Sequence, residues 1–291
     1  MKKDILILTG ASGFLGRHLA HELSHDFKVR AVSHHALRVK GVSDYKIGDL
    51  KDSTFLEQAL KGSNVVVHCA AITNTMDPNL ESVNVHYTER LVRAAKTAKV
   101  KRFVYISTEN VTYQCKDPYT QSKALAEFIV LESFKDALIL RPSLIFGRSD
   151  KRYLGIFVKA IRMLPLVPVF SQRACMLQPI HVEDVAKLTL QGLRLNKKGV
   201  FTLVGGGPMS FSEIGHFFAQ RIGKTCLFVP IPGFLIKGVS SLLAFGPKKA
   251  KRLHFMLENA FLMRNVNVRT LEENFAHTLP PLKERLKDIF L

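Results

Sequence analysis

The feature that most constrains this chain is a short apolar run, residues 5–8, that leads into the turn Thr9-Gly10-Ala11-Ser12-Gly13-Phe14-Leu15-Gly16. A tight turn after a buried strand requires a glycine where φ is positive. A second glycine lets the backbone approach a pyrophosphate, and a third lets the following helix pack against the strand. The start of that helix offers unpaired N–H groups to phosphates. We therefore predict a dinucleotide phosphate site formed by Gly10, Ser12, Gly13, Phe14, Leu15 and Gly16.

The first half of the chain alternates short apolar runs with amphipathic stretches. The expected strands are residues 5–8, 28–32, 65–68, 103–107 and 137–140, and 199–204 is expected to return to the same sheet. A helical pattern with a spacing near 3.6 runs from Val83 to Ala98, and a capping box begins a later helix at Ser210. Such alternation predicts an α/β fold, a Rossmann-type doubly wound parallel sheet with a smaller, mainly C-terminal substrate-binding region. We assign residues 1–145 and about 178–204 to dinucleotide binding, and 146–177 and 205–291 to the substrate-binding region.

The charge of the chain favours anionic partners. The formal net charge is +18, of which +5 falls in residues 1–145 and +13 in residues 146–291. This excess fits a phosphorylated substrate or a membrane surface, and a solvated basic surface is the alternative. No nucleic-acid-binding motif is present, so we expect no nucleic-acid partner. The four widely spaced cysteines form no metal-ligand pattern, so we expect no metal and reduced thiols in the cytoplasm. The apolar run at the start is too short for a signal peptide.

Tyr119 and Lys123 form the strongest chemical signal in the chain. Four residues apart on a helix, they share one face. Free tyrosine has a pKa of about 10, and a lysine ammonium nearby favours its phenolate. Such a pair can exchange the proton of an alcohol while a hydride moves to or from a nicotinamide. A pair on the surface of a helix is the alternative.

With these motifs the chain resembles an extended short-chain dehydrogenase/reductase of the NAD-dependent epimerase/dehydratase type, along nearly its whole length. Besides the glycine turn and the Tyr119–Lys123 pair, the matching motifs are Gly48-Asp49-Leu50, His68-Cys69-Ala70-Ala71, Val83-Asn84-Val85, Ser107-Thr108, Arg141-Pro142-Ser143-Leu144-Ile145-Phe146-Gly147 and Gln178-Pro179-Ile180-His181-Val182-Glu183-Asp184-Val185-Ala186. The segments from Pro165 to Pro168, from Gln178 to Ile180 and from Gly206 to Pro208 are similar to another branch, the nucleotide-binding accessory subunit of respiratory complex I and its bacterial relatives.

The resemblance assigns the site residues. It implies catalytic roles for Thr108, Tyr119 and Lys123, with Thr108 or Ser107 orienting the substrate oxygen. It implies cofactor contacts from Asp49, Leu50, Ala70, Ala71, Ser107, Tyr119, Lys123 and Pro142. Asn110 replaces an acid of the nucleotide-sugar dehydratases, which argues against elimination chemistry. Leu177 stands where many epimerases have a phosphate-binding arginine, and Arg173 is a possible substitute.

The turn after the second expected strand indicates the cofactor. An acid at this point binds the ribose 2′-hydroxyl of NAD. This chain has Ser33, His34 and His35 instead, with Arg38 and Lys40 close by. Ser33, His34 and Arg38 therefore suit the 2′-phosphate of NADP, which we favour over NAD.

A second apolar segment lies near the C-terminus. Residues 234–245 are followed by Lys248, Lys249, Lys251 and Arg252. Spanning a bilayer requires about 20 apolar residues, so this segment is too short. An apolar helix beside basic residues can lie on an anionic membrane, so we keep open a peripheral location at the inner face of the membrane. A substrate-domain helix that buries its apolar face is the alternative.

The sequence thus predicts an NAD(P)-dependent oxidoreductase or epimerase acting on a secondary alcohol or ketone. The net charge predicts a small, anionic substrate, and the resemblance adds a nucleotide sugar as a candidate and a homodimer. Two alternatives stay open. One is a non-catalytic NADPH-binding protein of structural or sensory role, and the other is a membrane-peripheral reductase of a sterol-like or lipid-linked substrate.

Overall fold

The structure is a computed structural model that describes residues 3–35, 38–113, 115–148, 150, 153–170, 176–260 and 266–290. It forms two compact units. The first contains Met1–Pro142, Val182–Leu203 and Leu271–His277, and the second contains Ser143–His181, Val204–Thr270 and Thr278–Leu291.

A seven-stranded sheet in the order β11-β6-β5-β4-β1-β2-β3 forms the centre of the first unit. Every pairing in it is parallel. Its strands are β1 (Ile5–Thr9), β2 (Lys28–Ser33), β3 (Val42–Ile47), β4 (Val65–His68), β5 (Arg102–Ile106), β6 (Leu138–Pro142) and β11 (Gly199–Leu203). This order is that of a doubly wound sheet, so the predicted fold class is confirmed.

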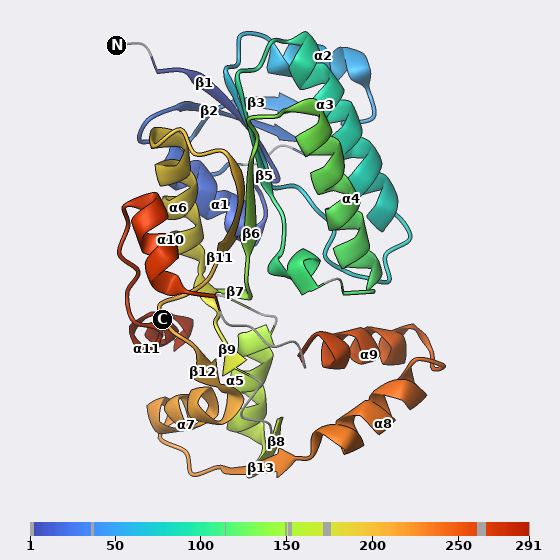
Figure 1. Cartoon of the computed structure of the whole chain (residues 1–291), viewed down its shortest axis with the longest axis vertical. Helices are drawn as coiled ribbons and strands as arrows, with labels where there is room; N and C mark the ends of the chain where they lie inside the picture. Colours follow the sequence, from blue (N-terminus) through green and yellow to red (C-terminus); the bar gives the residue numbers. More distant parts are fainter. Residues whose placement is uncertain are drawn as a thin grey trace. The chain divides into compact units, whose positions relative to one another are not determined.

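Helices cover both faces of this sheet (Figure 1). On one face lie α1 (Phe14–Leu23) and α6 (Val182–Arg194), and on the other lie α2 (Ser53–Leu60), α3 (Tyr87–Thr97) and α4 (Pro118–Ser133). The inner strands are apolar throughout because both faces are covered: Leu6, Ile7 and Leu8 of β1 are fully buried. A short helix of the π type, Ser82–His86, precedes α3, and a 3-10 helix, Glu109–Tyr113, precedes α4.

The seven-stranded sheet contains one strand that the sequence did not predict. β3, with the sequence VSDYKI, has no fully buried residue because it lies at the edge of the sheet. One of its polar residues bonds to the neighbouring strand, because Asp44 accepts a hydrogen bond from Arg30 of β2 over 2.6 Å. The return strand predicted at 199–204 is β11, and it pairs with β6.

The second unit consists of short strand pairs and helices. Its strands are β7 (Ile145–Phe146), β8 (Leu166–Phe170), β9 (Met176–Leu177), β10 (Ile180–His181), β12 (Met209–Ser210) and β13 (Leu227–Ile231). Its helices are α5 (Tyr153–Met163), α7 (Phe211–Ile222), α8 (Gly233–Leu243), α9 (Lys248–Ala260), α11 (Leu282–Arg285) and the 3-10 helix Leu286–Phe290. The predicted capping box begins α7, where Ser210 and Glu213 hydrogen-bond in both directions.

A segment from near the C-terminal end of the sequence is part of the first unit. Leu271–His277, which includes the end of α10 (Val268–Phe275), belongs to the first unit rather than to the region 205–291. Phe275 explains this placement, because it is fully buried and packs edge to face on Phe201 of β11 with 5.1 Å between ring centroids.

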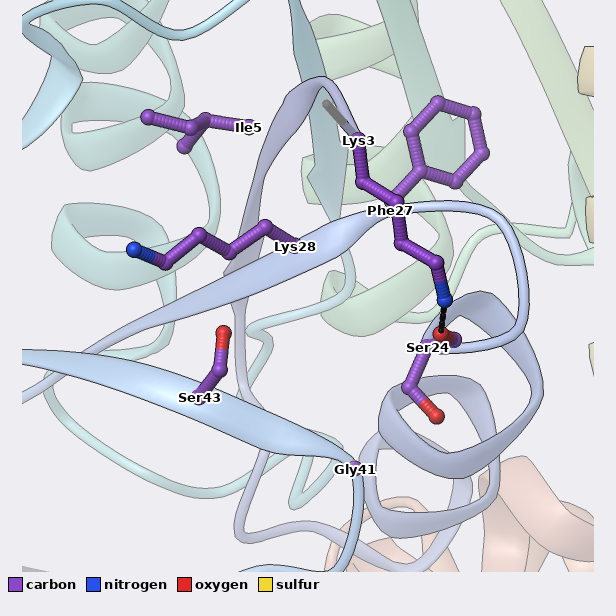
Figure 2. Close-up of a pocket in the computed structure, with 7 residues that line it drawn as sticks. All are labelled: Lys3, Ile5, Ser24, Phe27, Lys28, Gly41 and Ser43. Carbon is purple, nitrogen blue, oxygen red and sulfur yellow. Dashed lines mark hydrogen bonds between the residues drawn. The ribbon is translucent and has the colours of Figure 1, made fainter. Parts of the chain in front are cut away.

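A hollow of about 590 Å³ lies in the first unit (Figure 2). Its lining comes from the beginnings of strands: Lys3 and Ile5 at β1, Lys28 at β2 and Ser43 at β3. Lys3 donates a hydrogen bond from Nζ to the carbonyl of Ser24 over 2.8 Å. Ligands of doubly wound sheets bind at the carboxyl ends of the strands. This hollow is at the opposite ends, so it is not the cofactor site.

We expect Phe275→Ala to lower the free energy of unfolding by about 3–5 kcal/mol, because it removes a fully buried ring from the first unit. Urea unfolding measures this loss. Phe245→Ala is the matched control, since Phe245 is 91% exposed and its loss should change stability in the absence of lipid by less than about 0.5 kcal/mol. Equal effects of the two substitutions would show that the C-terminal segment does not stabilise the first unit.

Candidate active site

The order of the sheet reverses between β1 and β4, which places a ligand crevice at the carboxyl ends of these strands. There the chain passes through Gly10, whose φ is +73°. A Cβ on Gly10 would lie 2.6 Å from the backbone nitrogen of Ala70, and one on Gly16 would lie 1.9 Å from the carbonyl oxygen of Gly10. Both contacts are closer than any side chain allows. Glycine is thus required at both positions by the backbone itself.

The start of α1 is open to an anion. Its N-cap is Gly13, which has no side chain to cap the helix, and the first turn contains no acidic residue. Ser12 and Gly13 are exposed, whereas Leu15 and Gly16 are buried under the loop. Arg17 donates from Nε to the carbonyl of Ser12 over 3.0 Å, so a cation lies beside the turn. This arrangement fits the pyrophosphate of a dinucleotide.

The predicted residues for the adenosine half gather at the ends of β2 and β3. The hydroxyl of Ser33 donates to the carbonyl of His35, and the backbone of Gly48 donates to the carbonyl of Ser33. His34, Arg38 and Asp49 are exposed, and Leu50 is buried in the core. No acid stands at the end of β2, which fits a 2′-phosphate better than a 2′-hydroxyl.

A buried chain of hydrogen bonds connects the carboxyl ends of β1 and β4 to α3. His68 contacts Thr9 from Nδ1 over 2.6 Å and Thr88 from Nε2 over 2.8 Å. Thr88 donates its own proton to the carbonyl of Asn84, so it must accept one from His68. Nε2 of His68 therefore carries the proton, and Nδ1 accepts from Thr9. Burial, together with the charge of Lys123, lowers the pKa of His68 to about 3, so the ring is neutral.

Asn84 extends this chain to α4. Its side chain accepts from the backbone of Ile72 and donates to the carbonyl of the same residue and to Ser122 Oγ over 3.0 Å. Ser122 in turn donates to the backbone carbonyl of Tyr119 over 2.7 Å. The half-buried Tyr119 is thereby connected to the strand ends through buried and partly buried polar contacts.

Lys123 is a buried cation one helical turn beyond Tyr119. Only 2% of it is exposed, Nζ donates to the carbonyl of Ile106 over 2.6 Å, and Nζ lies 4.0 Å from the centre of the Tyr105 ring. Burial lowers its pKa to about 7, against a partial opposing effect of Cys69 and Glu127. Burial likewise raises the pKa of the Cys69 thiol to about 11, which keeps it neutral.

Glu127 is a buried acid that the sequence analysis missed. It lies one turn beyond Lys123, accepts a hydrogen bond from Ser107, and is paired with Arg141 of β6 over 2.6 Å. The signal was present, because an acid four residues after Lys123 continues the face of α4 that carries Tyr119. His68, Thr88 and Ser122 were likewise not assigned roles.

The two hydroxyls at the end of β5 differ in their surroundings. Ser107 is buried and donates to Glu127. Thr108 is half-buried and accepts a hydrogen bond of 3.4 Å from the backbone of Asn110. Ser107 is thus part of the support of α4, whereas Thr108 lies half-buried beside it.

The remaining predicted residues also lie at strand ends of the first unit. Ala70 and Ala71 follow β4, and Pro142 ends β6, where it is buried against Leu203 of β11 in the pairing register. Arg173 lies outside the described residues. Among the residues described, no group of three or more His, Cys, Asp or Glu side chains could hold a metal ion.

The buried amine of Lys123 makes stability depend on pH. Its pKa falls from 10.5 in the unfolded chain to about 7 in the fold. Between these values the unfolded chain binds a proton that the folded chain does not, so the free energy of unfolding rises with pH. We expect Lys123→Met to remove this rise, a slope of at most about 1.4 kcal/mol per pH unit.

Urea unfolding of both proteins at pH 7, 8 and 9 measures the difference in slope. Lys96→Met, at an exposed lysine of α3, is the control and should follow the unsubstituted protein. Parallel curves for Lys123→Met and the unsubstituted protein would contradict the assignment.

Three similar proteins illustrate the range of relatives. A mitochondrial NADH dehydrogenase [ubiquinone] 1 alpha subcomplex subunit 9 of Dictyostelium discoideum is 28% identical over 95% of this chain and 81% of its own. A ceramide reductase of Caulobacter vibrioides is 31% identical over 86% of this chain and 84% of its own. A UDP-glucose 4-epimerase of Vibrio cholerae is 27% identical over 80% of each.

Solved structures share the fold. The crystal structure of gox2253 superposes with a TM-score of 0.82 at 22% identity, covering 99% of this chain and 97% of that one. MoeE5 in complex with UDP-glucose and NAD gives a TM-score of 0.73 at 22% identity, covering 98% and 96%. The model of the NAD dependent epimerase/dehydratase family matches residues 6–203, which include the glycine turn, the Tyr119–Lys123 pair and all of the seven-stranded sheet except Ile5. The chain therefore belongs to the NAD dependent epimerase/dehydratase family and is an NAD(P)-dependent oxidoreductase or epimerase.

Proposed function

We propose that this protein interconverts a secondary alcohol and a ketone, with Tyr119 as the acid/base. When bound, the nicotinamide group supplies or accepts the hydride. Tyr119 exchanges the proton with the substrate oxygen, and Thr108 orients that oxygen through its hydroxyl. Lys123 holds the nicotinamide ribose and, through its positive charge, lowers the pKa of Tyr119.

The observation that carries this proposal is the placement of Lys123. Its amine is held at the carboxyl end of β5 by the Ile106 carbonyl, one turn from Tyr119. Burial brings the pKa of this amine to about 7, so its charge responds to its surroundings at neutral pH. The Glu127–Arg141 pair and the Asn84–Ser122 contact keep α4 in place on either side. Support for Thr108 over Ser107 comes from the bond that occupies Ser107.

We propose NADP as the preferred cofactor, held by the glycine turn from Gly10 to Gly16 and, at its 2′-phosphate, by Ser33, His34 and Arg38. The exposure of His34 and Arg38 at the end of β2, without an acid beside them, supports this choice. Asp49, Ala70, Ala71 and Pro142 complete the proposed contacts. A homodimer through α3 and α4 is also proposed, and the exposed Leu125 and Phe128 on α4 support it.

Two substrate classes follow from the relatives. A nucleotide sugar is the class named for the Vibrio cholerae relative, and ceramide is named for the Caulobacter relative. One observation favours a lipid-linked ketone as the second candidate. Leu177, at the position where many epimerases hold a phosphate with arginine, is 6% exposed and packed in the core of the second unit. A nucleotide diphosphate gains no charge contact there.

Tyr119→Phe tests the catalytic role. The substitution removes only the proton-exchanging hydroxyl, so we expect turnover to fall about 10²–10⁴-fold while cofactor affinity changes by less than about twofold. The readout is epimer formation or NADP⁺ reduction with UDP-sugars and NADPH oxidation with long-chain ceramide-like ketones, alongside NADPH binding by fluorescence. Tyr153→Phe, at a half-exposed tyrosine of α5, is the control. Full activity of Tyr119→Phe would refute the mechanism, and NADPH binding without turnover of either class would favour the non-catalytic alternative.

Arg38→Ala tests the cofactor preference. Loss of one charge from the 2′-phosphate site should raise the dissociation constant of NADPH about tenfold or more and leave that of NADH nearly unchanged. Lys28→Ala is the matched control, because Lys28 begins β2 at the end opposite the proposed 2′-phosphate site. An equal loss of affinity for both cofactors would contradict the proposed 2′-phosphate contact.

A further inference from the structure

Helix α8 exposes its apolar side chains. Near the two ends of the helix, Phe234 is 73% exposed and Leu242 is 76% exposed, and Phe245, just beyond the C-terminal end, is 91% exposed. Leu235 and Val239 are 50% and 53% exposed. At 100° per residue these five side chains fall within an arc of about 140° on one side of the helix. Helices of soluble proteins turn such an arc to the core. The expectation that this helix buries its apolar face is therefore wrong for these five residues.

The opposite side of α8 packs against α9 and contains one buried polar residue. Ser240 is fully buried, and its hydroxyl lies 2.8 Å from His254 Nδ1 and 2.9 Å from Glu258 Oε1. The two helices form a hairpin that Figure 1 shows leading away from α5 and α7 of the same unit. A surface helix usually turns its apolar face to the core and its polar face to solvent, and α8 differs at these residues. The hairpin is thus built to present apolar side chains outward.

Basic residues border this apolar face. The first turns of α9, which begins three residues after Phe245, contain four exposed basic residues: Lys248, Lys249, Lys251 and Arg252. No acidic residue occurs in the sequence between Glu213 and Glu258, a stretch that contains seven lysines and arginines. An occupant of this surface must therefore combine an apolar interior with negative charge at its boundary.

We propose that the α8–α9 hairpin docks this protein on an anionic lipid bilayer. The aromatic and aliphatic side chains of α8 enter the interfacial region, and the basic start of α9 contacts the headgroups. A second copy of the chain fits less well, because two such surfaces would bring like charges together. The hairpin does not cross the bilayer, since no helix among the described residues is long and apolar enough to span one.

Vesicle sedimentation tests this docking without cofactor or substrate, so its outcome is independent of the proposed reaction. The probes are vesicles of phosphatidylcholine alone and of phosphatidylcholine mixed equally with phosphatidylglycerol. We expect binding to the mixed vesicles that weakens as salt is raised, and much weaker binding to phosphatidylcholine. Absence of binding to the mixed vesicles at low salt would overturn the proposal.

Two sets of substitutions locate the surface. Phe234→Ser, Leu242→Ser and Phe245→Ser combined should weaken binding roughly tenfold or more, because these apolar side chains no longer leave water. Lys248→Gln, Lys249→Gln and Lys251→Gln combined should weaken it roughly a hundredfold, at about fivefold for each charge near the surface. All six side chains are exposed, so we expect these variants to keep the fold, and circular dichroism checks that they do.

Controls use matched exposed residues elsewhere. Met163→Ser removes an apolar side chain that is 79% exposed at the end of α5, and Lys96→Gln, Lys99→Gln and Lys101→Gln combined remove three exposed lysines from the first unit. Both should bind like the unsubstituted protein. Equal binding by the hairpin variants and these controls would overturn the proposal. So would light scattering that shows a dimer lost with the α8 substitutions, because a second copy would then cover this face.

Discussion

The site depends on one buried hydrogen-bonded residue, His68. Its neutral ring joins Thr9 at the end of β1 to Thr88 on α3, and the chain continues through Asn84 and Ser122 to the backbone of Tyr119. Buried polar groups are costly unless each finds a partner, so a chain in which every donor and acceptor is matched has one stable arrangement. The glycine turn, which begins directly after Thr9, and the helix that carries Tyr119 are therefore held in a fixed relation.

Helix α4 contains two buried charged residues, Lys123 and Glu127, and each has partners for its polar atoms. Glu127 is paired with Arg141 and bonded by Ser107, so its carboxylate has partners on two strands. Lys123 has a carbonyl and an aromatic face instead of a direct acid partner, and its pKa falls accordingly. The first arrangement stabilises the position of the helix. The second leaves an amine whose charge is sensitive to whatever binds beside it, which suits a residue that serves a proton-exchanging tyrosine.

Helices α8 and α9 differ from the rest of the second unit in where their apolar side chains lie. Most of its apolar side chains are buried in a core around Phe146, Leu154 and Phe218, as expected of any folded domain. The hairpin instead exposes five apolar side chains of α8 and its C-terminal turn, while Ser240 makes a buried polar contact with α9. The four basic residues that begin α9 contribute +4 to the net charge of +13 in the second half of the chain. An enzyme held at a bilayer would have direct access to a lipid-linked substrate.

The sequence by itself determined the sheet and the glycine turn, because strand periodicity and the need for glycine at Gly10 and Gly16 are local properties of the chain. It could not reveal β3, whose polar residues read as a loop until their partners on β2 are known. Only the tertiary structure separated Ser107 from Thr108, since the acid that bonds Ser107 lies twenty residues away. It likewise decided which way the apolar arc of α8 faces. The order of residues in a helix determines which side chains share a face. Whether that face contacts the core, another helix or solvent depends on contacts between residues far apart in the chain.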